Sequence, residues 1–253
     1  MEQVSDLDMP VSIEVDILDG PGGFAKPTSR LTRLRQSVRG GKVEQARQFH
    51  AIIEAADRIA KTDPSALHGL IRLLGRSVQA HSLMNWSRVE RHDCDPDATL
   101  FSSRFPITGD GKCFDDLKDK LAIHERISLT TDIILPWPWE PQRLTKSLVN
   151  LSPGGRWGKW KQDHLNHHIE LWLPWRIAWV HGGNHSITAG VVYGTGKLKP
   201  ELVYDISDVY KHVRCDGLTF RRVHDNKVVA PVSDLEMAAI FEIGRLLVGQ
   251  RNS

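Results

Sequence analysis

The fold of this chain is decided by the stretch Ile177-Ala-Trp-Val-His-Gly-Gly-Asn-His-Ser-Ile-Thr-Ala-Gly-Val-Val-Tyr193. Its first four residues are apolar, with the length and composition typical of a buried strand. Gly182 and Gly183 then form a turn that a residue with a Cβ would strain. Asn184 or Ser186 can cap a helix that follows. The stretch therefore predicts a strand, a glycine turn and a helix in immediate succession.

We call residues 182–186 the elbow, and predict that it binds an anion. A strand that leads through glycines into a helix directs backbone N–H groups and the positive end of the helix dipole at one point. The predicted binding residues are Gly182, Gly183, Asn184 and Ser186. An ordinary turn is the alternative interpretation, because Gly-Gly-Asn-His is too short a motif to be specific.

The composition is that of a globular protein without a membrane span. The chain has 253 residues, of which 40% are hydrophobic and 25% charged, enough for one large domain or two small ones. It contains no apolar run of about 18 residues, and its acidic N-terminus does not resemble a signal peptide. Three widely spaced cysteines do not form a disulfide framework or a metal motif, which favours the cytoplasm. A net charge of +2 does not by itself indicate nucleic-acid binding.

Three regions are expected along the chain. Residues 1–28 are interpreted as a flexible arm, residues 29–124 as a helical region, and residues 125–253 as an α/β region. The helical region begins with a basic segment, residues 30–42, which contains Arg30, Arg33, Arg35, Arg39 and Lys42. This basic segment can contact a phosphate backbone or a partner. It can equally be a solvated helix face, since no aromatic residues lie among its charges.

The helical region is expected to contain a hairpin of two helices. Apolar residues at helical spacing predict helices over residues 42–61 and 67–83, joined at Asp63-Pro64-Ser65 and packed antiparallel. Between this hairpin and a short amphipathic helix expected over residues 114–123 lies the run Arg91 to Asp97. That run can bind a metal or form a solvated loop, and it lacks a recognised ligand spacing.

From residue 127 onward the pattern alternates between strands and helices, which predicts an α+β fold. The expected strands cover residues 127–135, 169–173, 177–180, 202–209 and 210–215. A helix is expected over residues 142–151 and another after the elbow. Residues 218–223 and 227–232 are expected to form a β-hairpin, followed by a last helix over residues 235–248.

Tryptophans are concentrated in the same region. Seven of the eight lie close together in sequence: Trp137, Trp139, Trp157, Trp160, Trp172, Trp175 and Trp179. Tryptophan buries a large apolar area, but its N–H group needs a partner. The cluster can therefore line a base-stacking or ligand pocket, or it can form a tryptophan-rich core.

Three polar residues near the elbow are candidates for chemistry: Asp163, His167 and His185. In one interpretation they converge as metal ligands or acid–base groups, because histidine changes charge near neutral pH. In the other they only hydrogen-bond the loops around the tryptophans. The chain has no helical His-x-x-x-His pair and no Cys-x-x-Cys pair, so no protein metal site is predicted.

Two segments resemble motifs of the superfamily that contains partition protein B and sulfiredoxin (ParB/Srx). The segment Leu135-Pro-Trp-Pro-Trp-Glu-Pro-Gln-Arg143 resembles the proline- and arginine-bearing segment that follows the first strand in that superfamily. Gly183-Asn-His-Ser-Ile-Thr-Ala189 resembles its Gly-x-His-Arg-x-x-Ala motif, which opens a helix that binds nucleotide phosphate. Ser186 stands where the superfamily has arginine, which removes a fixed charge. The whole chain also resembles an uncharacterised bacterial family, a domain of unknown function.

The ParB/Srx resemblance implies a mixed sheet with flanking helices, onto which the N-terminal hairpin would pack. It further implies ATP or CTP with Mg²⁺ as cofactor, and an activity as nucleotide hydrolase, kinase, nuclease or DNA-binding clamp. We therefore expect a nucleotide- or phosphodiester-binding protein with His185, Asp163 and His167 in catalytic roles. Arg143 would neutralise phosphate charge at the elbow. A non-enzymatic module that contacts nucleic acid or protein through the basic segment is the alternative.

Overall fold

The computed structural model describes residues 30–87 and 100–251, with side chains from Gly40 onward except those of Asn85 and Arg251. The predicted arm (residues 1–28) and the run from residue 91 to residue 97 lie outside the described residues. Residues 40–253 form one compact unit, distinct from a unit that ends at Arg39. None of the helices in the described ranges is both long and apolar enough to cross a membrane.

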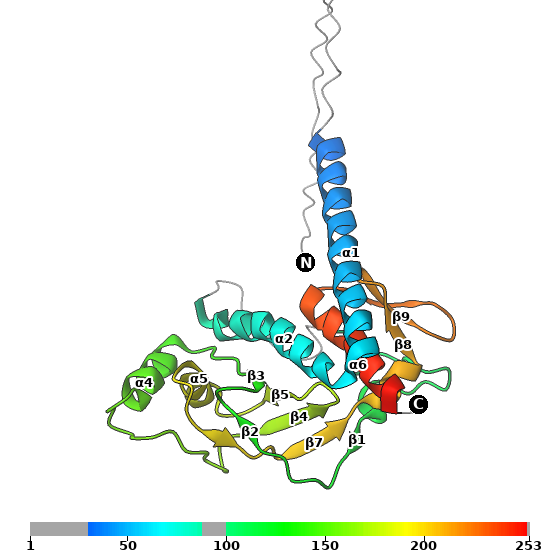
Figure 1. The fold of residues 1–253 in the computed structure, drawn as a ribbon. Helices are drawn as coiled ribbons and strands as arrows, with labels where there is room; N and C mark the ends of the chain where they lie inside the picture. The colour runs from blue at the N-terminus through cyan, green and yellow to red at the C-terminus, as the bar shows by residue number, and fades with distance from the viewer. Residues whose placement is uncertain (1–29, 88–99, 252–253) are drawn as a thin grey trace, which may run out of the picture. The chain divides into compact units, whose positions relative to one another are not determined.

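Helices and strands alternate along most of the chain (Figure 1). The helices are α1 (Arg30–Thr62), α2 (Leu67–Leu83), α4 (Pro141–Leu151), α5 (Asn184–Val192) and α6 (Leu235–Arg251), with short 3-10 helices at Pro64–Ala66, Asn85–Ser87, Asp115–Leu117 and Ser207–Lys211. The strands are β1 (Asp119–Lys120), β2 (Ile127–Ser128), β3 (Ile133–Leu135), β4 (Ile169–Leu173), β5 (Ile177–Val180), β6 (Lys197–Leu198), β7 (Leu202–Asp205), β8 (Val213–Cys215), β9 (Thr219–Arg222) and β10 (Val228–Pro231).

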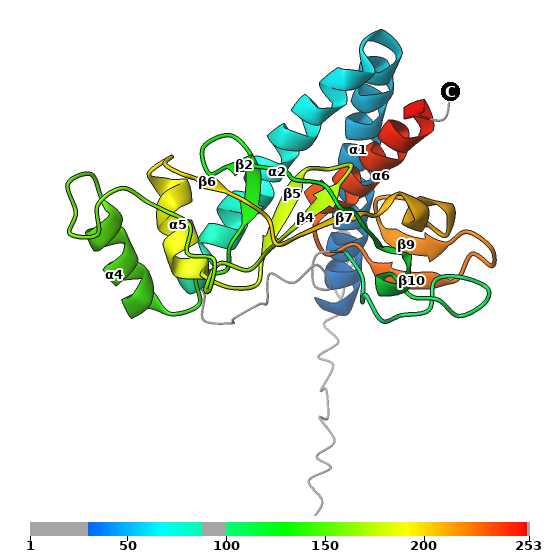
Figure 2. The same ribbon diagram turned by 90° about the horizontal axis from the view of Figure 1, so that it is seen from below.

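A five-stranded mixed sheet forms the centre of the unit, with the strand order β1-β7-β4-β5-β3. Strand β3 is parallel to β5 and β4 is parallel to β7, whereas β4 and β5 form an antiparallel pair. Helices and sheet strands together make an α+β fold, as the sequence predicts (Figures 1 and 2).

Both faces of this sheet are covered, because alternate side chains of its strands enter two separate cores. Ile177 and Trp179 of β5 belong to the larger core, which includes residues of α2 and α6. Ala178 and Val180 point to the opposite face and pack in a second core with Ile187 of α5. Strand β5 is therefore buried along its whole length, and it places the elbow at the edge of the second core.

Most of the predicted elements are confirmed, and three predictions of strands or helices are wrong. The strands expected over residues 202–209 and 210–215 are shorter than predicted, because Ser207–Lys211 forms a 3-10 helix between β7 and β8. Strands β4 and β5 have the predicted bounds, and α4 begins one residue before its predicted start. The strand expected over residues 127–135 is interrupted by a turn in which the Asp132 carboxylate accepts a hydrogen bond from the Ser128 N–H at 2.7 Å. The helix expected over residues 114–123 contains only one 3-10 turn followed by β1, because Leu121 N–H and β1 pair with β7.

The two N-terminal helices are present and join at the predicted turn, where Asp63 caps the 3-10 helix with an acceptor 3.0 Å from Ser65 N–H. Helix α1 is longer than expected and begins at Arg30. Helix α2 leaves the end of α1 at a wide angle and packs on α6 and β3 (Figure 1), so the antiparallel packing predicted for the two helices is not formed. Gly75 gives α2 its close approach to the sheet, since a Cβ there would lie 2.8 Å from Ile133.

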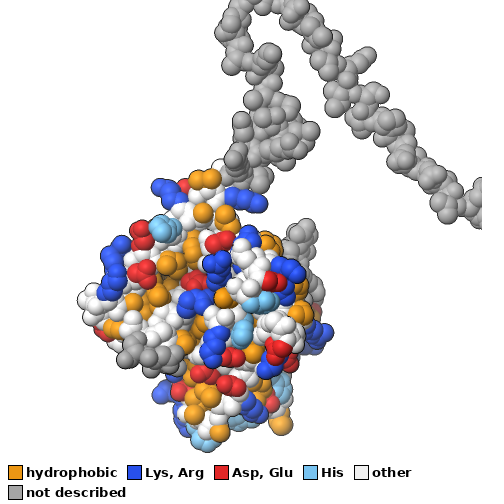
Figure 3. All heavy atoms as spheres, turned by 90° about the vertical axis from the view of Figure 1, so that its right-hand side faces the viewer, with side chains coloured by type: hydrophobic (Ala, Val, Ile, Leu, Met, Phe, Trp, Pro, Cys, Tyr) orange, Lys and Arg blue, Asp and Glu red, His pale blue; other side chains and the backbone are white. Residues whose placement is uncertain are grey.

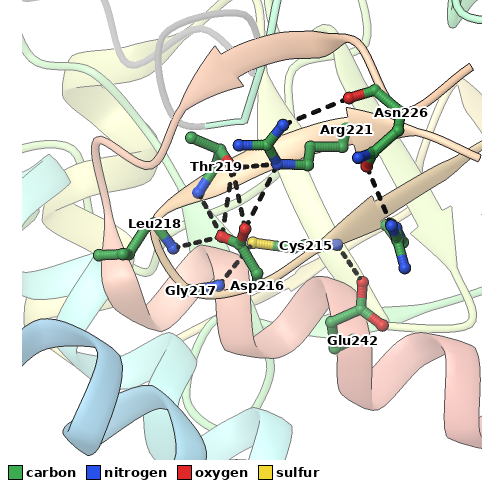
Figure 4. Close-up of polar contacts among 9 residues, drawn as sticks. Cys215, Asp216, Gly217, Leu218, Thr219, Arg221, Asn226 and Glu242 are labelled. Carbon is green, nitrogen blue, oxygen red and sulfur yellow. Dashed lines mark hydrogen bonds and ion pairs between the residues drawn. The ribbon is translucent and has the colours of Figure 1, made fainter.

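A smaller sheet of order β10-β9-β8 contains the predicted hairpin, β9 and β10. The Asp216 carboxylate organises its β8–β9 turn by accepting hydrogen bonds from Leu218 and Thr219, and Glu242 of α6 accepts from Cys215 N–H at 2.7 Å (Figure 4). Figure 3 shows basic and acidic side chains interspersed on the right-hand side of the molecule as drawn in Figure 1. Ion pairs within and next to the small sheet fit that pattern: Arg222 with Asp225, Arg221 with Asp216, and Lys211 with Asp208.

Candidate functional site

The elbow has the predicted strand–turn–helix geometry, but its cap differs from the prediction. Gly183 is the N-cap of α5 and has a left-handed backbone, with φ 76°, so the prediction that Asn184 or Ser186 caps the helix is wrong. The Asn184 side chain instead accepts a hydrogen bond from Trp137 N–H at 2.7 Å. The first backbone bond of the helix runs from Ile187 N–H to Gly183 C=O at 3.0 Å. The three preceding N–H groups therefore have no acceptor within α5.

Both glycines of the elbow are needed because the loop of residues 163–168 closes against them. A Cβ at Gly182 would lie 2.6 Å from the Asn166 carbonyl oxygen, and a Cβ at Gly183 would overlap the His167 ring. The side of the elbow that faces this loop is thus filled. The other side remains open to a cavity, so the elbow is accessible from one direction.

That opening, which we call the elbow cavity, has a volume of about 450 Å³. Helix α4, the elbow and the loop before β4 supply its walls. The lining residues are Trp139, Arg143, Lys146, Ser147, Trp157, Asn166, His181, Gly182, Gly183, Asn184, His185 and Ser186. Arg143 and His185, 42 positions apart in the chain, therefore face the same space as all four predicted binding residues of the elbow.

The charge of the elbow cavity comes from one face of α4. Arg143 and Lys146 are three residues apart, so they project from the same side of the helix. The Arg143 guanidinium lies 5.4 Å from the centre of the Trp139 ring, and the Lys146 ammonium 5.9 Å from that of Trp157. Neither cation forms an ion pair with any described residue. Their positive charge adds to that of the N-terminus of α5.

His185 is held as a neutral donor. Its Nε2 accepts a hydrogen bond from Glu140 N–H at 3.0 Å, so the ring proton is on Nδ1 in the neutral imidazole. Burial lowers the pKa of His185, and the nearby charge of Arg143 lowers it further. A neutral histidine with a free Nδ1–H suits hydrogen-bond donation to a ligand better than proton abstraction.

His167 and Ser186 belong to one continuous chain of hydrogen bonds. Nδ1 of His167 accepts from Asp163 N–H at 3.0 Å, so Nε2 carries the proton and donates to the Ser186 hydroxyl at 2.6 Å. That hydroxyl in turn donates to Gly183 C=O at 3.1 Å. Burial lowers the pKa of His167, which keeps the ring neutral. In this arrangement His167 orients Ser186 and does not deprotonate it.

Asp163 and His167 line a second opening, the loop cavity, with a volume of about 600 Å³. Trp157, Asn166 and Ser186 line both cavities, so the two are neighbours. The structure thus brings Arg143 and His185 together on one side of Ser186, and Asp163 and His167 on the other. Across residues 30–87 and 100–251, no group of three or more His, Cys, Asp or Glu side chains is placed to hold a metal ion.

The tryptophan cluster is divided between the core and the surface of a cavity. Trp172, Trp175 and Trp179 are buried in the larger core, whereas Trp139 and Trp157 are 36% and 47% exposed and line the elbow cavity. Sequence reasoning did not single out Lys146 as a site residue. Its spacing from Arg143 on the predicted helix was the available signal.

The fold and the site define an α+β protein with an open, cationic cavity at the N-terminus of a buried helix. The chain belongs to a family of unknown function, DUF6710, whose family model matches residues 35–253. Comparisons with curated proteins and with solved structures gave no match. The resemblance to the ParB/Srx superfamily therefore stays a prediction.

Proposed function

We propose that this protein binds a nucleotide or the phosphodiester of a nucleic acid in the elbow cavity. The observation that supports this most strongly is the meeting of Arg143, Lys146 and the N-terminus of α5 around one open space. Two unpaired cations and free backbone N–H groups are the groups that bind phosphate in proteins. The volume of about 450 Å³ is within the range of small-molecule sites.

The exposed tryptophans favour a nucleotide over a simple anion such as inorganic phosphate. Trp139 and Trp157 lie beside the two cations, and each has an exposed aromatic surface. An aromatic face of this kind can stack on any of the nucleobases, because every base has a π-face. Backbone N–H groups of the elbow and the His185 Nδ1–H would hold the phosphate, and Arg143 would neutralise it.

The proposal also covers a phosphoryl-transfer or hydrolytic activity on the bound nucleotide. ATP or CTP would bring Mg²⁺ bound to its own phosphates, since this ion keeps several waters and few protein ligands. Asp163 would then be the carboxylate available to a water or to the metal from the loop cavity. His167 would act by holding Ser186 and the elbow in place, and His185 by donating a hydrogen bond.

Titration of the protein with ATP, CTP and adenosine, with and without Mg²⁺, tests the proposal. Trp139 and Trp157 line the cavity, so tryptophan fluorescence can follow binding alongside calorimetry. We expect both nucleotides to bind, adenosine to bind much more weakly, and Arg143→Ala to weaken nucleotide binding about 10- to 100-fold, as for the loss of one charged hydrogen bond. Arg58→Ala, at an exposed position of α1, is the matched control.

Two results would overturn this proposal. One is the absence of binding of any nucleotide at millimolar concentration. The other is nucleotide binding that Arg143→Ala leaves unchanged, which would locate the ligand elsewhere on the chain. The alternative function, contact with nucleic acid or protein through the basic segment, stays a prediction. The side chains of residues 30–39 lie outside the described part of the chain. Of the five basic residues named in this segment, Lys42 alone has a described side chain, and it is exposed.

A further inference from the structure

The elbow cavity adjoins the loop cavity, and the size and charge of the loop cavity limit which ligands fit the site. Each cavity alone has a volume suited to one nucleotide-sized group, about 450 Å³ and about 600 Å³. They meet at Trp157, Asn166 and Ser186. A mononucleotide held at the elbow would leave the larger of the two openings empty.

Cationic side chains flank the junction on both sides. Arg143 and Lys146 line the elbow cavity, and Lys159 and Lys161 line the loop cavity. None of these four forms an ion pair with a described residue, whereas Asp163 is the one carboxylate that lines either cavity. Four unpaired cations spread over two neighbouring cavities favour a polyanion with repeated charges over a single phosphate.

Trp157 stands at the junction as an aromatic platform. Its side chain is 47% exposed, and its backbone N–H donates to Asn150 C=O at 2.9 Å. The loop that carries it is fixed again at Gln162, which exchanges two hydrogen bonds with the backbone of Lys199 at 2.7 and 2.9 Å. The backbone that carries the Trp157 ring is therefore held in position before any ligand binds.

Trp160 has a different role in the same loop. It is buried, its ring stacks on His167 with 5.3 Å between ring centroids, and its Nε1–H donates to Ser186 C=O at 2.8 Å. It therefore forms the floor that supports the junction. Trp157 is left as the ring on which a base can stack.

From this arrangement we infer that the ligand is a single strand of nucleic acid at least two nucleotides long. One nucleotide occupies the elbow cavity and the next occupies the loop cavity, with a base stacked on Trp157 at the junction. The bases must be unpaired to present their faces to a side chain in this way. This inference rests on the proposed function, because it assigns the first nucleotide to the elbow.

The test compares thymidine mononucleotide, dinucleotide and hexanucleotide, as DNA and as the uridine RNA series, with a blunt duplex as competitor. We expect the dinucleotide to bind about 10-fold or more tightly than the mononucleotide, as for one added stacked base, and the duplex to compete poorly. The double variant Lys159→Ala/Lys161→Ala is expected to reduce that gain, because it removes the cations of the loop cavity, and to leave mononucleotide affinity unchanged. It is also expected to reduce the salt dependence of hexanucleotide binding, by about 0.7 in slope for each phosphate that a lysine no longer neutralises.

Matched variants separate a local effect from a general loss of charge or of folding. The double variant Lys61→Ala/Lys120→Ala removes two exposed lysines that line neither cavity, and it should bind the dinucleotide like the parent protein. Trp157→Ala should reduce dinucleotide affinity about 10-fold, and Trp157→Phe should retain most of it. The DNA and RNA series reveal which strand is preferred, and a gain in either one supports the inference.

The possible failures are distinct. Mononucleotide binding that depends on Arg143, with no gain for the dinucleotide, overturns this inference and leaves the proposed function standing. A dinucleotide gain that neither Lys159→Ala/Lys161→Ala nor Trp157→Ala reduces, or a duplex that binds as well as the single strand, also overturns it. Absence of binding by every nucleotide and oligonucleotide overturns both proposals together.

Discussion

At the scale of single residues, the geometry of the elbow depends most directly on Gly183. It has φ 76°, a conformation that costs an L-residue about 1–2 kcal/mol. The position that its Cβ would occupy is filled by the His167 ring. Because His167 also holds Ser186, one missing side chain allows the loop, the serine and the start of α5 to meet.

A side chain at this position should therefore lower the free energy of unfolding by more than the cost of the left-handed backbone alone. We expect Gly183→Ala to lower the free energy of unfolding by about 2–4 kcal/mol, since it adds the steric cost of overpacking to the conformational cost. Gly154→Ala is the matched control, because Gly154 has φ 81° but no atom within 4 Å of an added Cβ. Urea unfolding of both variants measures the difference. Equal losses would mean that the His167 ring moves away at no cost.

The contacts around Gly183 also explain which candidate site residues can be predicted from the sequence and which cannot. Glycines, a following helix and nearby histidines are visible locally, so the elbow and His185 could be identified. Ser186 was predicted among the phosphate-binding residues of the elbow, and its hydroxyl is engaged by His167 and Gly183. That pairing joins residues 19 positions apart, and no spacing rule connects them. What the elbow offers a ligand from Ser186 is the backbone N–H.

At the scale of elements, the predictions succeeded where strong breakers bound an apolar run. Strand β5 ends before two glycines and β4 ends before Pro174, and both were predicted with their observed bounds. Prediction failed where pairing with a distant strand decided the structure. Residues 114–123 have an amphipathic pattern, but β1 pairs with β7, more than 80 positions further along the chain. Tertiary pairing of this kind overrides a local pattern.

The outer edge of β3 is another feature that only the tertiary structure explains. Strand β3 ends the five-stranded sheet, and a polar side chain of α2 covers the outward carbonyl group of Ile134. The Gln79 amide donates to Ile134 C=O at 2.8 Å and accepts from Arg76 at 2.6 Å, although Gln79 is only 3% exposed. An unpaired strand edge would otherwise invite association with another chain.

Removal of this cover should destabilise the protein. We expect Gln79→Leu to lower the free energy of unfolding by about 1–3 kcal/mol, because Ile134 C=O would stay buried without a donor. Gln48→Leu, at an exposed position of α1 where the amide bonds only Glu44, should change it by less than about 0.5 kcal/mol. Thermal or urea unfolding measures both. A Gln79→Leu variant as stable as the parent would show that water reaches the edge of β3.

At the scale of the whole molecule, α6 couples the small sheet to the rest of the compact unit. Met237, Ile240 and Phe241 of α6 are buried in the larger core, while Arg245 and Glu242 reach outward to the small sheet. The Arg245 guanidinium donates to Tyr210 C=O, to Val213 C=O at 2.6 Å and to the Glu242 carboxylate at 2.6 Å. Glu242 then accepts from Cys215 N–H, as Figure 4 shows.

This coupling predicts that a substitution of Arg245 lowers the stability of the compact unit as a whole, and not that of the small sheet alone. All eight tryptophans lie outside β8, β9 and β10, so no fluorescent side chain belongs to the small sheet itself, although Phe220 of β9 shares the larger core with Trp175. We expect Arg245→Met to lower the midpoint of urea unfolding seen by fluorescence, with a loss of about 2–3 kcal/mol, since Glu242 and two carbonyl groups would lose a charged donor. Hydrogen exchange of the β9 amides should show the same loss, because a single domain unfolds as one unit.

Arg214→Met is the matched control in the same sheet, because Arg214 is exposed and donates only to the Asn226 side chain. It should change neither measurement by more than about 0.5 kcal/mol. If Arg245→Met accelerates exchange in β9 while the fluorescence midpoint stays fixed, the small sheet unfolds independently of the large one. The network around Arg245 would then hold only a local structure, and α6 would not couple the two sheets.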